Sequence, residues 1–214
     1  MGNAVRRRGR RRDPELAARR REEILAAAAT LFARRAYPDT DLQELADSLG
    51  IAKGTIYTYF PSKEKLFLAA VDRGMRMLRE HVLAAAAAVP DPLDRVVVAI
   101  RAYLEFFKDH PDQAELLIIE RAKFRDRKKP TYLEHREVNR VFWREVYAGL
   151  IRDGRVRDVP VSRILDVVGD LLYGTMFTNH FAGHSKPLAT QAADVIDVVF
   201  NGILTPAERA GRGR

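Results

Sequence analysis

Hydrophobic residues recur with the period of an α-helix along almost the whole chain, whereas the strict alternation typical of strands is nearly absent. In the helix predicted to begin at Pro14, one apolar stripe comprises Ile24, Leu25, Ala28, Leu31 and Phe32. No sequence period of about 20 to 50 residues repeats, which argues against a solenoid. The pattern therefore predicts an all-α fold.

The same periodicity predicts further helices toward the C-terminus. A long helix follows Ser62, runs to the alanine block 84–88 and ends before Pro90. Shorter helices are predicted near 93–108, at 111–123 and at 131–152, and Gly154 ends the last of these. The final two, 161–182 and 187–204, are the most apolar of the chain.

Residues 40–63 have the pattern of two short helices joined by a glycine turn. The apolar positions of the first helix fall at i, i+3, i+4 and i+7 and are Leu42, Leu45, Ala46 and Leu49. This helix stops at Gly50, which tolerates a left-handed exit, and a second begins near Lys53. Ile56 and Phe60 share one inward face, which turns Gly54, Thr55, Tyr57 and Thr58 outward. A helix-turn-helix aimed at a DNA groove is predicted.

Two N-cap registers fit the first of these helices. Either Thr40 caps it with Gln43 completing a capping box, or Asp41 caps it with Glu44 one residue later. Both registers turn a helix N-terminus outward, where backbone N–H groups can meet a phosphate.

Lysines and tyrosines surround the second helix. Lys53 and Lys63 bracket it, and the phenols of Tyr57 and Tyr59 can donate to phosphate oxygens or pack against a thymine methyl. The alternative is a structural helix hairpin with ordinary surface lysines, which does not require two outward tyrosines.

Residues 22–67 resemble the DNA-binding domain of the TetR/AcrR family of bacterial transcriptional regulators. The resemblance lies in Leu31-Phe32-Ala33, in the segment from Thr40 to Ala46 and above all in Lys53-Gly54-Thr55-Ile56-Tyr57-Thr58-Tyr59-Phe60-Pro61-Ser62-Lys63-Glu64-Lys65-Leu66. It implies that the DNA backbone is contacted by Thr40, Gln43, Tyr57, Tyr59 and Lys63. It also implies that Lys53, Gly54 and Thr55 lie nearest the base edges.

The sequence departs from the family pattern at two positions. Ala36 stands where the family usually has a glycine that ends the first helix. Asp41 stands where Ser or Thr is commoner, close to the expected path of a phosphate.

Charge agrees with a nucleic-acid partner. Lys and Arg total 37 against 29 acidic residues, a net charge of +8, and six arginines lie in the first twelve residues. Such an arm cannot bury apolar surface, so it is expected to be disordered alone and to enter a minor groove or follow phosphates through Arg10, Arg11 and Arg12. The alternative is a solubilising tail without specific contacts.

Composition excludes several other classes. The hydrophobic fraction of 47% suffices for a core without metals, and the absence of cysteine excludes disulfides, thiol redox sensing and cysteine-based zinc sites. The N-terminus lacks the apolar core of a signal peptide, and no run approaches membrane-spanning length. We therefore expect a cytoplasmic protein without a membrane partner or a cofactor.

The last two helices are predicted to form a dimerisation module. Their apolar and small residues extend around more of each helix than one neighbour within a monomer covers, as a twofold four-helix bundle requires. The expected interface residues are Leu165, Val168, Leu172, Ile196 and Phe200. The alternative is a monomer in which both helices are fully buried.

Aromatic residues gather between 93 and 181, and a ring-lined pocket is the usual form of a small-molecule site in a helical bundle. Candidate contacts for a lipophilic effector are Phe106, Phe107, Glu120, Phe124, Trp143, Tyr147, Tyr173 and Phe177. For Glu120 the structural alternative is an ion pair with Lys123 or Arg121.

No catalytic or metal site is predicted. His180 and His184 are four residues apart, as two metal ligands on one helix face would be, but no third ligand lies at a matching spacing. A phosphate-cradling glycine loop, a nucleophile elbow and a zinc-protease signature are all absent.

The sequence thus predicts four parts. A disordered basic arm (1–13) precedes a three-helix helix-turn-helix domain (14–67), which is followed by an effector-binding and dimerisation domain (68–206) and a flexible tail (207–214). The predicted function is a homodimeric repressor that a lipophilic small molecule releases from its operator, with efflux or catabolic genes implied as targets by the resemblance. The alternatives are an effector-independent DNA-organising or cell-cycle protein and, less compatible with the tyrosine-bearing helix, a helical enzyme.

Overall fold

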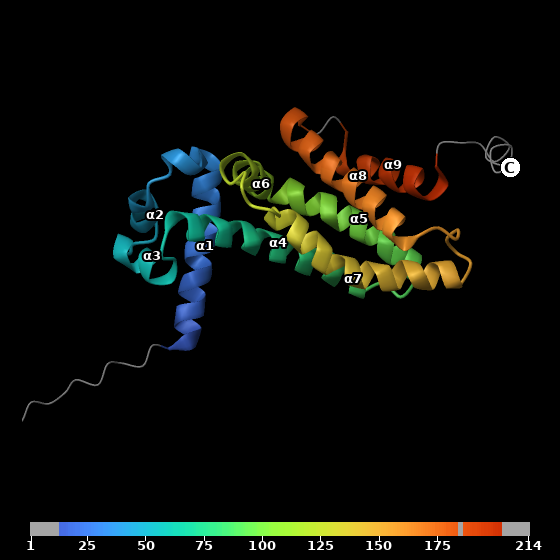
Figure 1. The fold of residues 1–214 in the computed structure, drawn as a ribbon, viewed down its shortest axis with the longest axis horizontal. Coiled ribbons are helices and arrows are strands. Elements are labelled where there is room, and N and C mark those ends of the chain that lie inside the picture. The colour runs from blue at the N-terminus through green and yellow to red at the C-terminus, as the bar shows by residue number, and fades with distance from the viewer. Residues whose placement is uncertain (1–12, 184–185, 203–214) are drawn as a thin grey trace, which may run out of the picture. The chain divides into compact units, whose positions relative to one another are not determined.

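The computed structural model describes residues 13–183 and 186–202, which form nine helices and no strand (Figure 1). The helices are α1 Pro14–Asp39, α2 Leu42–Ser48, α3 Lys53–Tyr59, α4 Lys63–Ala87, α5 Pro92–Asp109, α6 Pro111–Lys123, α7 Thr131–Arg152, α8 Val161–Ala182 and α9 Leu188–Asn201. The predicted all-α fold is confirmed. The chain divides into two compact units, Met1–Ala70 and Val71–Arg214. The predicted contacts Arg10, Arg11 and Arg12, the tail 207–214 and His184 lie outside the described residues.

In the first unit, carboxylates cap the N-termini of α1 and α2. Asp13 accepts a hydrogen bond from the backbone N–H of Glu15 at 3.0 Å, and Pro14 follows at the first helical position. Asp41 accepts from the N–H of Gln43 at 2.8 Å and begins α2, which decides between the two registers that the sequence allows.

Aromatic side chains form the centre of the first unit. Phe32 of α1 lies edge-on to Phe67 of α4, with 5.1 Å between ring centroids, and Tyr37 packs against both. Ile56 and Phe60 are buried as predicted, so the opposite side of α3 faces outward. Gly50 has the left-handed backbone (φ +61°) that was expected where the first helix of the helix-turn-helix, α2, ends.

Ala36 interrupts α1 with a backbone conformation that is unusual for an L-residue. Its φ of 59° and ψ of 165° lie in a region that glycine occupies readily and that a Cβ atom disfavours. The chain thus has alanine at a position with a positive φ, where the sequence resemblance led us to expect glycine.

In the second unit, α5 is the central helix and packs against α6, α7, α8 and α9. α7 runs along α8, as Figure 1 shows, and ion pairs join them through Arg136 to Asp170 and Arg140 to Asp166. Helix α4 begins in the first unit and continues into the second, where His135 of α7 lies 2.8 Å from the Asp72 carboxylate.

Glu120 has a structural role, which corrects its prediction as a ligand contact. The side chain is 2% exposed, and its carboxylate accepts hydrogen bonds from the Thr131 N–H and hydroxyl at the start of α7. Arg127 pairs with the same carboxylate at 3.1 Å. Because these donors already satisfy the buried charge, Glu120 links α6 to α7 and is not free for a cationic ligand.

The face of α8 that was predicted to form the dimer interface points into the protein instead of outward. Leu165, Val168 and Leu172, expected at a dimer interface, line an internal cavity of their own chain. The outward apolar residues of α8 are Val167, Leu171 and Phe181, and those of α9 are Val198 and Phe200. The stripe was misassigned because apolar residues occupy most of the circumference of α8, so that periodicity alone does not identify the inward face.

The helices in residues 13–183 and 186–202 include no candidate for a membrane-spanning segment, since none combines the required length with sufficient apolar character.

Candidate functional site

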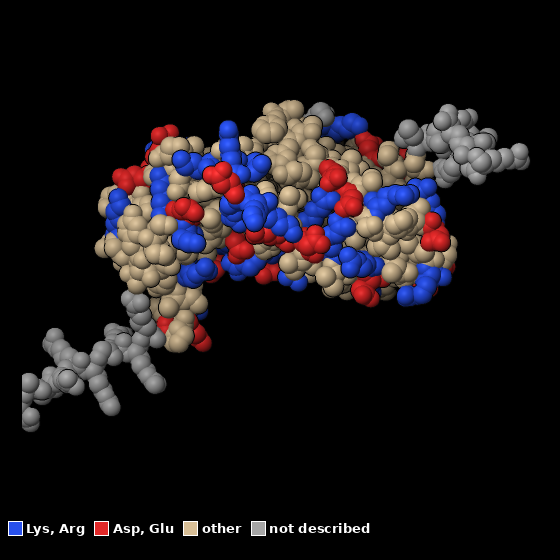
Figure 2. Space-filling view, in the orientation of Figure 1, with Lys and Arg blue, Asp and Glu red and all other residues tan. Residues whose placement is uncertain are grey.

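The outward side of α3 carries small, hydroxyl and aromatic groups on a firmly packed base. Ile56 and Phe60 fix the helix from below, while Gly54, Tyr57 and Thr58 are exposed. The Tyr57 phenol forms no hydrogen bond within the described residues, and its side chain is 44% exposed. Figure 2 shows the surface over α3 as largely uncharged, with basic and acidic atoms at its margin. This surface can enter a groove without bringing a carboxylate on α3 itself toward the phosphates.

Two lysines beside this surface are held by neighbours in the first unit. Lys53 Nζ lies 3.0 Å from Asp41 Oδ1, so the carboxylate that caps α2 also pairs with a predicted base-reading lysine. The backbone hydrogen bond from Gln43, with help from Lys53, lowers the pKa of Asp41. Lys63 Nζ donates to the Pro38 carbonyl at 3.1 Å and lies 5.0 Å from the centre of the Tyr37 ring.

The remaining predicted DNA contacts differ in exposure. Gln43 is exposed and donates to Asp47 Oδ1, whereas Thr55 and Tyr59 are half-buried. Thr40 is buried and its hydroxyl donates to the Ala36 carbonyl at 2.6 Å. The Thr40 side chain is therefore occupied within the protein and is not displayed for a phosphate.

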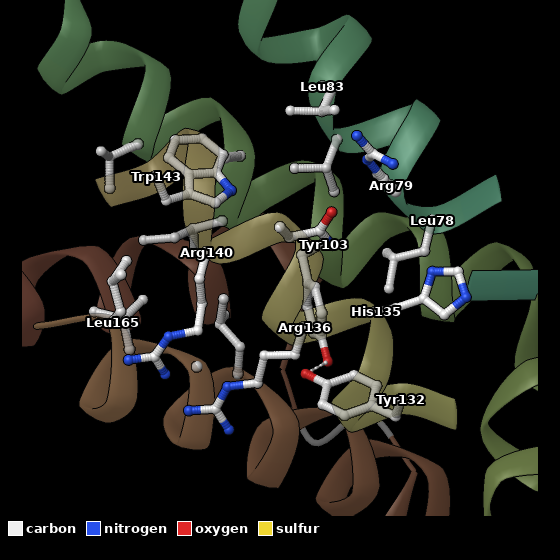
Figure 3. Close-up of a pocket in the computed structure, with 18 of the residues that line it drawn as sticks. Leu78, Arg79, Leu83, Tyr103, Tyr132, His135, Arg136, Arg140, Trp143 and Leu165 are labelled. Atoms are coloured by element: carbon white, nitrogen blue, oxygen red, sulfur yellow. Dashed lines mark hydrogen bonds between the residues drawn. The ribbon is translucent and has the colours of Figure 1, made fainter. Parts of the chain in front are cut away.

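A cavity of about 150 Å³ lies within the second unit between α4, α5, α7 and α8 (Figure 3). Its apolar lining consists of Met75, Leu78, Val82, Leu83, Val96, Ala99, Ile100, Leu165, Val168 and Leu172. Its aromatic lining consists of Tyr103, Tyr132, Trp143 and Tyr147. These residues come from helices spread over almost a hundred positions, and an apolar cavity of this kind suits a small lipophilic molecule.

Tyrosine hydroxyls meet at the base of the cavity. The phenol oxygens of Tyr103 and Tyr132 lie 3.0 Å apart, as the dashed line in Figure 3 marks. Burial raises the pKa of Tyr103 well above its usual value and raises the pKa of Tyr132 to about 12. Both phenols therefore stay neutral near pH 7 and act only as hydrogen-bonding groups.

Polar side chains also line the cavity, chiefly from α7. His135 and Asn139 are one helical turn apart, as are Arg136 and Arg140, and α4 adds Arg79. The Asn139 Oδ1 atom is buried and has no hydrogen-bond partner within the described residues. These polar residues were not predicted from the sequence, although the two i, i+4 pairs on α7 indicate a shared helix face.

Two of the eight predicted ligand contacts, Trp143 and Tyr147, line this cavity. Phe107 lines a second cavity of about 120 Å³ together with His180, which pairs with Glu115 at 2.8 Å. The predicted contacts that line neither cavity are Phe106, Glu120, Phe124, Tyr173 and Phe177. Most of these rings pack against other rings, as between Tyr173 and Phe177 at 4.7 Å.

Large apolar side chains are exposed on both α8 and α9. They are Val167, Leu171, Phe181, Val198 and Phe200, to which we refer as the outer apolar face. Figure 2 shows an uncharged area over the C-terminal part of α8. Single exposed apolar residues are common on proteins, but a group on two successive helices is typical of an interaction surface.

Comparisons of sequence point to one class of protein. Residues 24–70 match the family model described as bacterial regulatory proteins, tetR family. The HTH-type transcriptional regulator YerO of Bacillus subtilis is 37% identical over 92 residues, which span 42% of this chain but only 32% of YerO. The transcriptional repressor KstR2 of Mycobacterium tuberculosis is 29% identical over 148 residues, 66% of this chain and 72% of KstR2.

Solved structures share the fold. The regulator FadR from Bacillus subtilis, whose structure was determined in complex with stearoyl-CoA, matches with a TM-score of 0.71 at 17% identity. The match covers 86% of this chain and 99% of that protein. A similar arrangement of helices thus occurs in a transcriptional regulator that was crystallised with stearoyl-CoA.

Proposed function

Because the chain belongs to the TetR family of bacterial regulatory proteins, we propose that it is a homodimeric repressor released from operator DNA by a small lipophilic effector. The observation that carries the proposal is the continuous helix α4. It follows directly after α3 and, further along, supplies the wall residues Met75, Leu78 and Leu83 of the cavity.

The DNA-binding part of the proposal rests on α3. In this proposal Lys53, Gly54 and Thr55 approach the base edges, and Tyr57, Tyr59 and Lys63 contact the phosphate backbone. Gln43 of α2 adds a further contact with the phosphate backbone. The arm residues Arg10, Arg11 and Arg12 are proposed to add sequence-independent affinity.

The effector part of the proposal rests on the cavity. A molecule that enters it contacts α4 directly, and a displacement of α4 changes the position of a recognition helix attached to its start. Effector and operator then weaken each other's binding by the same factor. The relatives named as a repressor and as a lipid-bound regulator agree with this type of control. Efflux or catabolic genes that act on the effector are the proposed targets.

The dimer part of the proposal rests on the outer apolar face. A twofold axis through α8 and α9 buries this face against its copy and forms a four-helix bundle. Two recognition helices separated by about 34 to 36 Å then meet successive major grooves on one side of DNA.

A footprint on the DNA upstream of the protein's own gene tests the proposal. The protein is added with and without a panel of fatty acids, steroid acids, aromatic acids and the matching alcohols. We expect a protected palindrome that at least one compound releases. Protection that no compound alters, together with a cavity that binds none of them, favours the effector-independent DNA-organising alternative instead.

A further inference from the structure

In the part of the chain that the structure describes, the cavity is lined by basic side chains but not by acidic ones. Among the described residues that line it are Arg79, Arg136 and Arg140 as well as His135, and none is Asp or Glu. A lining of apolar and aromatic groups with only basic ionisable side chains suits a molecule that combines an apolar body with a negative charge.

Two of the three arginines are already neutralised by α8. Arg136 donates to Asp170 Oδ1 at 2.6 Å and to the Asp166 carbonyl at 3.1 Å, and Arg140 pairs with the Asp166 carboxylate. Gly169 makes room for this arrangement, since a Cβ atom there would lie 2.9 Å from the Arg136 guanidinium. These arginines fasten α7 to α8 and contribute little net charge to the cavity.

Arg79 differs from that pair. It is exposed, so it lies where the cavity meets solvent, and it forms no ion pair with any described residue. In Figure 3 it extends from α4, away from the two guanidinium groups of Arg136 and Arg140 beside α8. The uncompensated positive charge of the site is therefore on α4.

The size of the cavity limits the apolar body. Its volume of about 150 Å³ equals that of an engineered protein cavity that binds benzene. A ring or a short chain fits within it, whereas a chain as long as stearoyl does not without enlargement.

We propose that the effector is a compact amphipathic anion, an aromatic or short branched carboxylic acid, whose body fills the cavity and whose carboxylate pairs with Arg79. This inference rests on the proposed function and specifies its ligand class. A hydrogen-bond donor on the body of the ligand, such as a hydroxyl group, can also satisfy Asn139, whose buried Oδ1 accepts hydrogen bonds and has no partner among the described residues. The carboxylate then binds directly to α4, the helix that adjoins the recognition helix.

The fluorescence of Trp143 provides a direct test, because it is the single tryptophan and lines the cavity. The full-length protein is titrated with 3-phenylpropanoate, 3-phenylpropan-1-ol, 3-phenylpropylamine and stearate. We expect the acid to bind about tenfold more tightly than the alcohol, the ratio typical of one charge-assisted hydrogen bond. The amine and stearate should bind more weakly than the alcohol.

Three variants assign the difference to one residue. Arg79→Gln should abolish the preference for the acid and leave the affinity for the alcohol unchanged, whereas Arg79→Lys should keep part of the preference. Arg101→Gln, an exposed arginine of α5 outside the cavity lining, is the matched control.

The inference is overturned if the acid and alcohol bind equally, if Arg79→Gln keeps the preference, if stearate binds best or if no member of the series binds. In each of these cases release of the operator by another compound would still support the proposed function. Conversely, binding that depends on Arg79 without operator release would support the ligand class and reject the regulatory function.

Discussion

The recognition surface and the cavity differ in how they are built. The recognition surface consists of exposed side chains on a seven-residue helix, with polar contacts to near neighbours such as Lys53 to Asp41, twelve positions apart. The cavity requires four helices, and its ion pairs join positions such as Arg136 and Asp170, thirty-four apart. A substitution of a side chain on α3 that has no partner among the described residues, such as Tyr57, should therefore change binding alone, whereas a substitution in the cavity lining should also change stability.

The largest effect is expected on the inner side of α8. Leu165→Lys places an unpaired charge near Arg140 in a buried position and should lower the free energy of unfolding by about 3 kcal/mol or more. Urea denaturation followed by circular dichroism measures this loss.

The neighbouring outer side provides the matched variant. Leu171→Lys alters an exposed position, so the protomer should stay folded while the dimer dissociates in sedimentation experiments. A folded, fully dimeric Leu171→Lys variant with normal operator affinity would reject the proposed interface.

The next effect concerns the recognition helix. Tyr57→Ala should weaken operator binding by about 1 to 3 kcal/mol without loss of stability, because the phenol has no described partner in the free protein. Lys63→Ala should weaken binding similarly but also cost stability, since Lys63 contacts Pro38 and Tyr37. Fluorescence anisotropy with labelled operator compares both, and unchanged affinity in both variants would exclude the assignment of α3.

A smaller effect is expected at the interruption of α1. Ala36→Gly removes the steric cost of the positive φ and should stabilise the protein by about 1 kcal/mol. Ala33→Gly, within the regular part of α1, is the control and should destabilise by about 1 kcal/mol. Equal loss of stability in both variants would mean that residue 36 is helical.

The smallest effect concerns an exposed ion pair. The Arg155 side chain lowers the pKa of Asp91 to about 2. A lowered pKa means that the ionised carboxylate favours the folded state, and this contribution is fully present above the unfolded pKa near 4 and is lost as the pH falls through about 2. Asp91→Asn keeps the hydrogen bonds that cap α5 and removes the charge.

The thermal midpoint of Asp91→Asn should thus lie slightly below that of the wild type at pH 6. The two midpoints should converge near pH 2. A difference that is constant across this range would show that the charge of Asp91 is not responsible.

The helices were predictable wherever proline and glycine mark their ends. The bounds 111–123, 131–152 and 161–182 agree with α6, α7 and α8, because Pro111, Pro130, Pro160, Gly154 and Gly183 stand at or beside them. The outward side of α3 was predictable because only two inward residues are needed to orient a short helix.

The cavity was not predictable in the same way. Aromatic content identified the region but not the lining, since a ring in a bundle packs as readily against another ring as around a cavity. The sequence also did not decide whether Thr40 or Asp41 caps α2. In the folded chain the Thr40 hydroxyl donates a hydrogen bond to the Ala36 carbonyl, and Asp41 caps the helix. Both the lining of the cavity and the cap of α2 depend on contacts that form only in the folded chain.

The proposed function requires that effector binding in the cavity and operator binding at α3 are coupled. The most direct test titrates Trp143 fluorescence with the most tightly binding compound of the series, in the absence and presence of saturating operator DNA. We predict that operator DNA weakens effector binding by at least about fivefold, the lower end of typical coupling, and that effector weakens operator binding by the same factor. Identical titration curves with and without operator would show that the two sites are independent and would reject the proposed function.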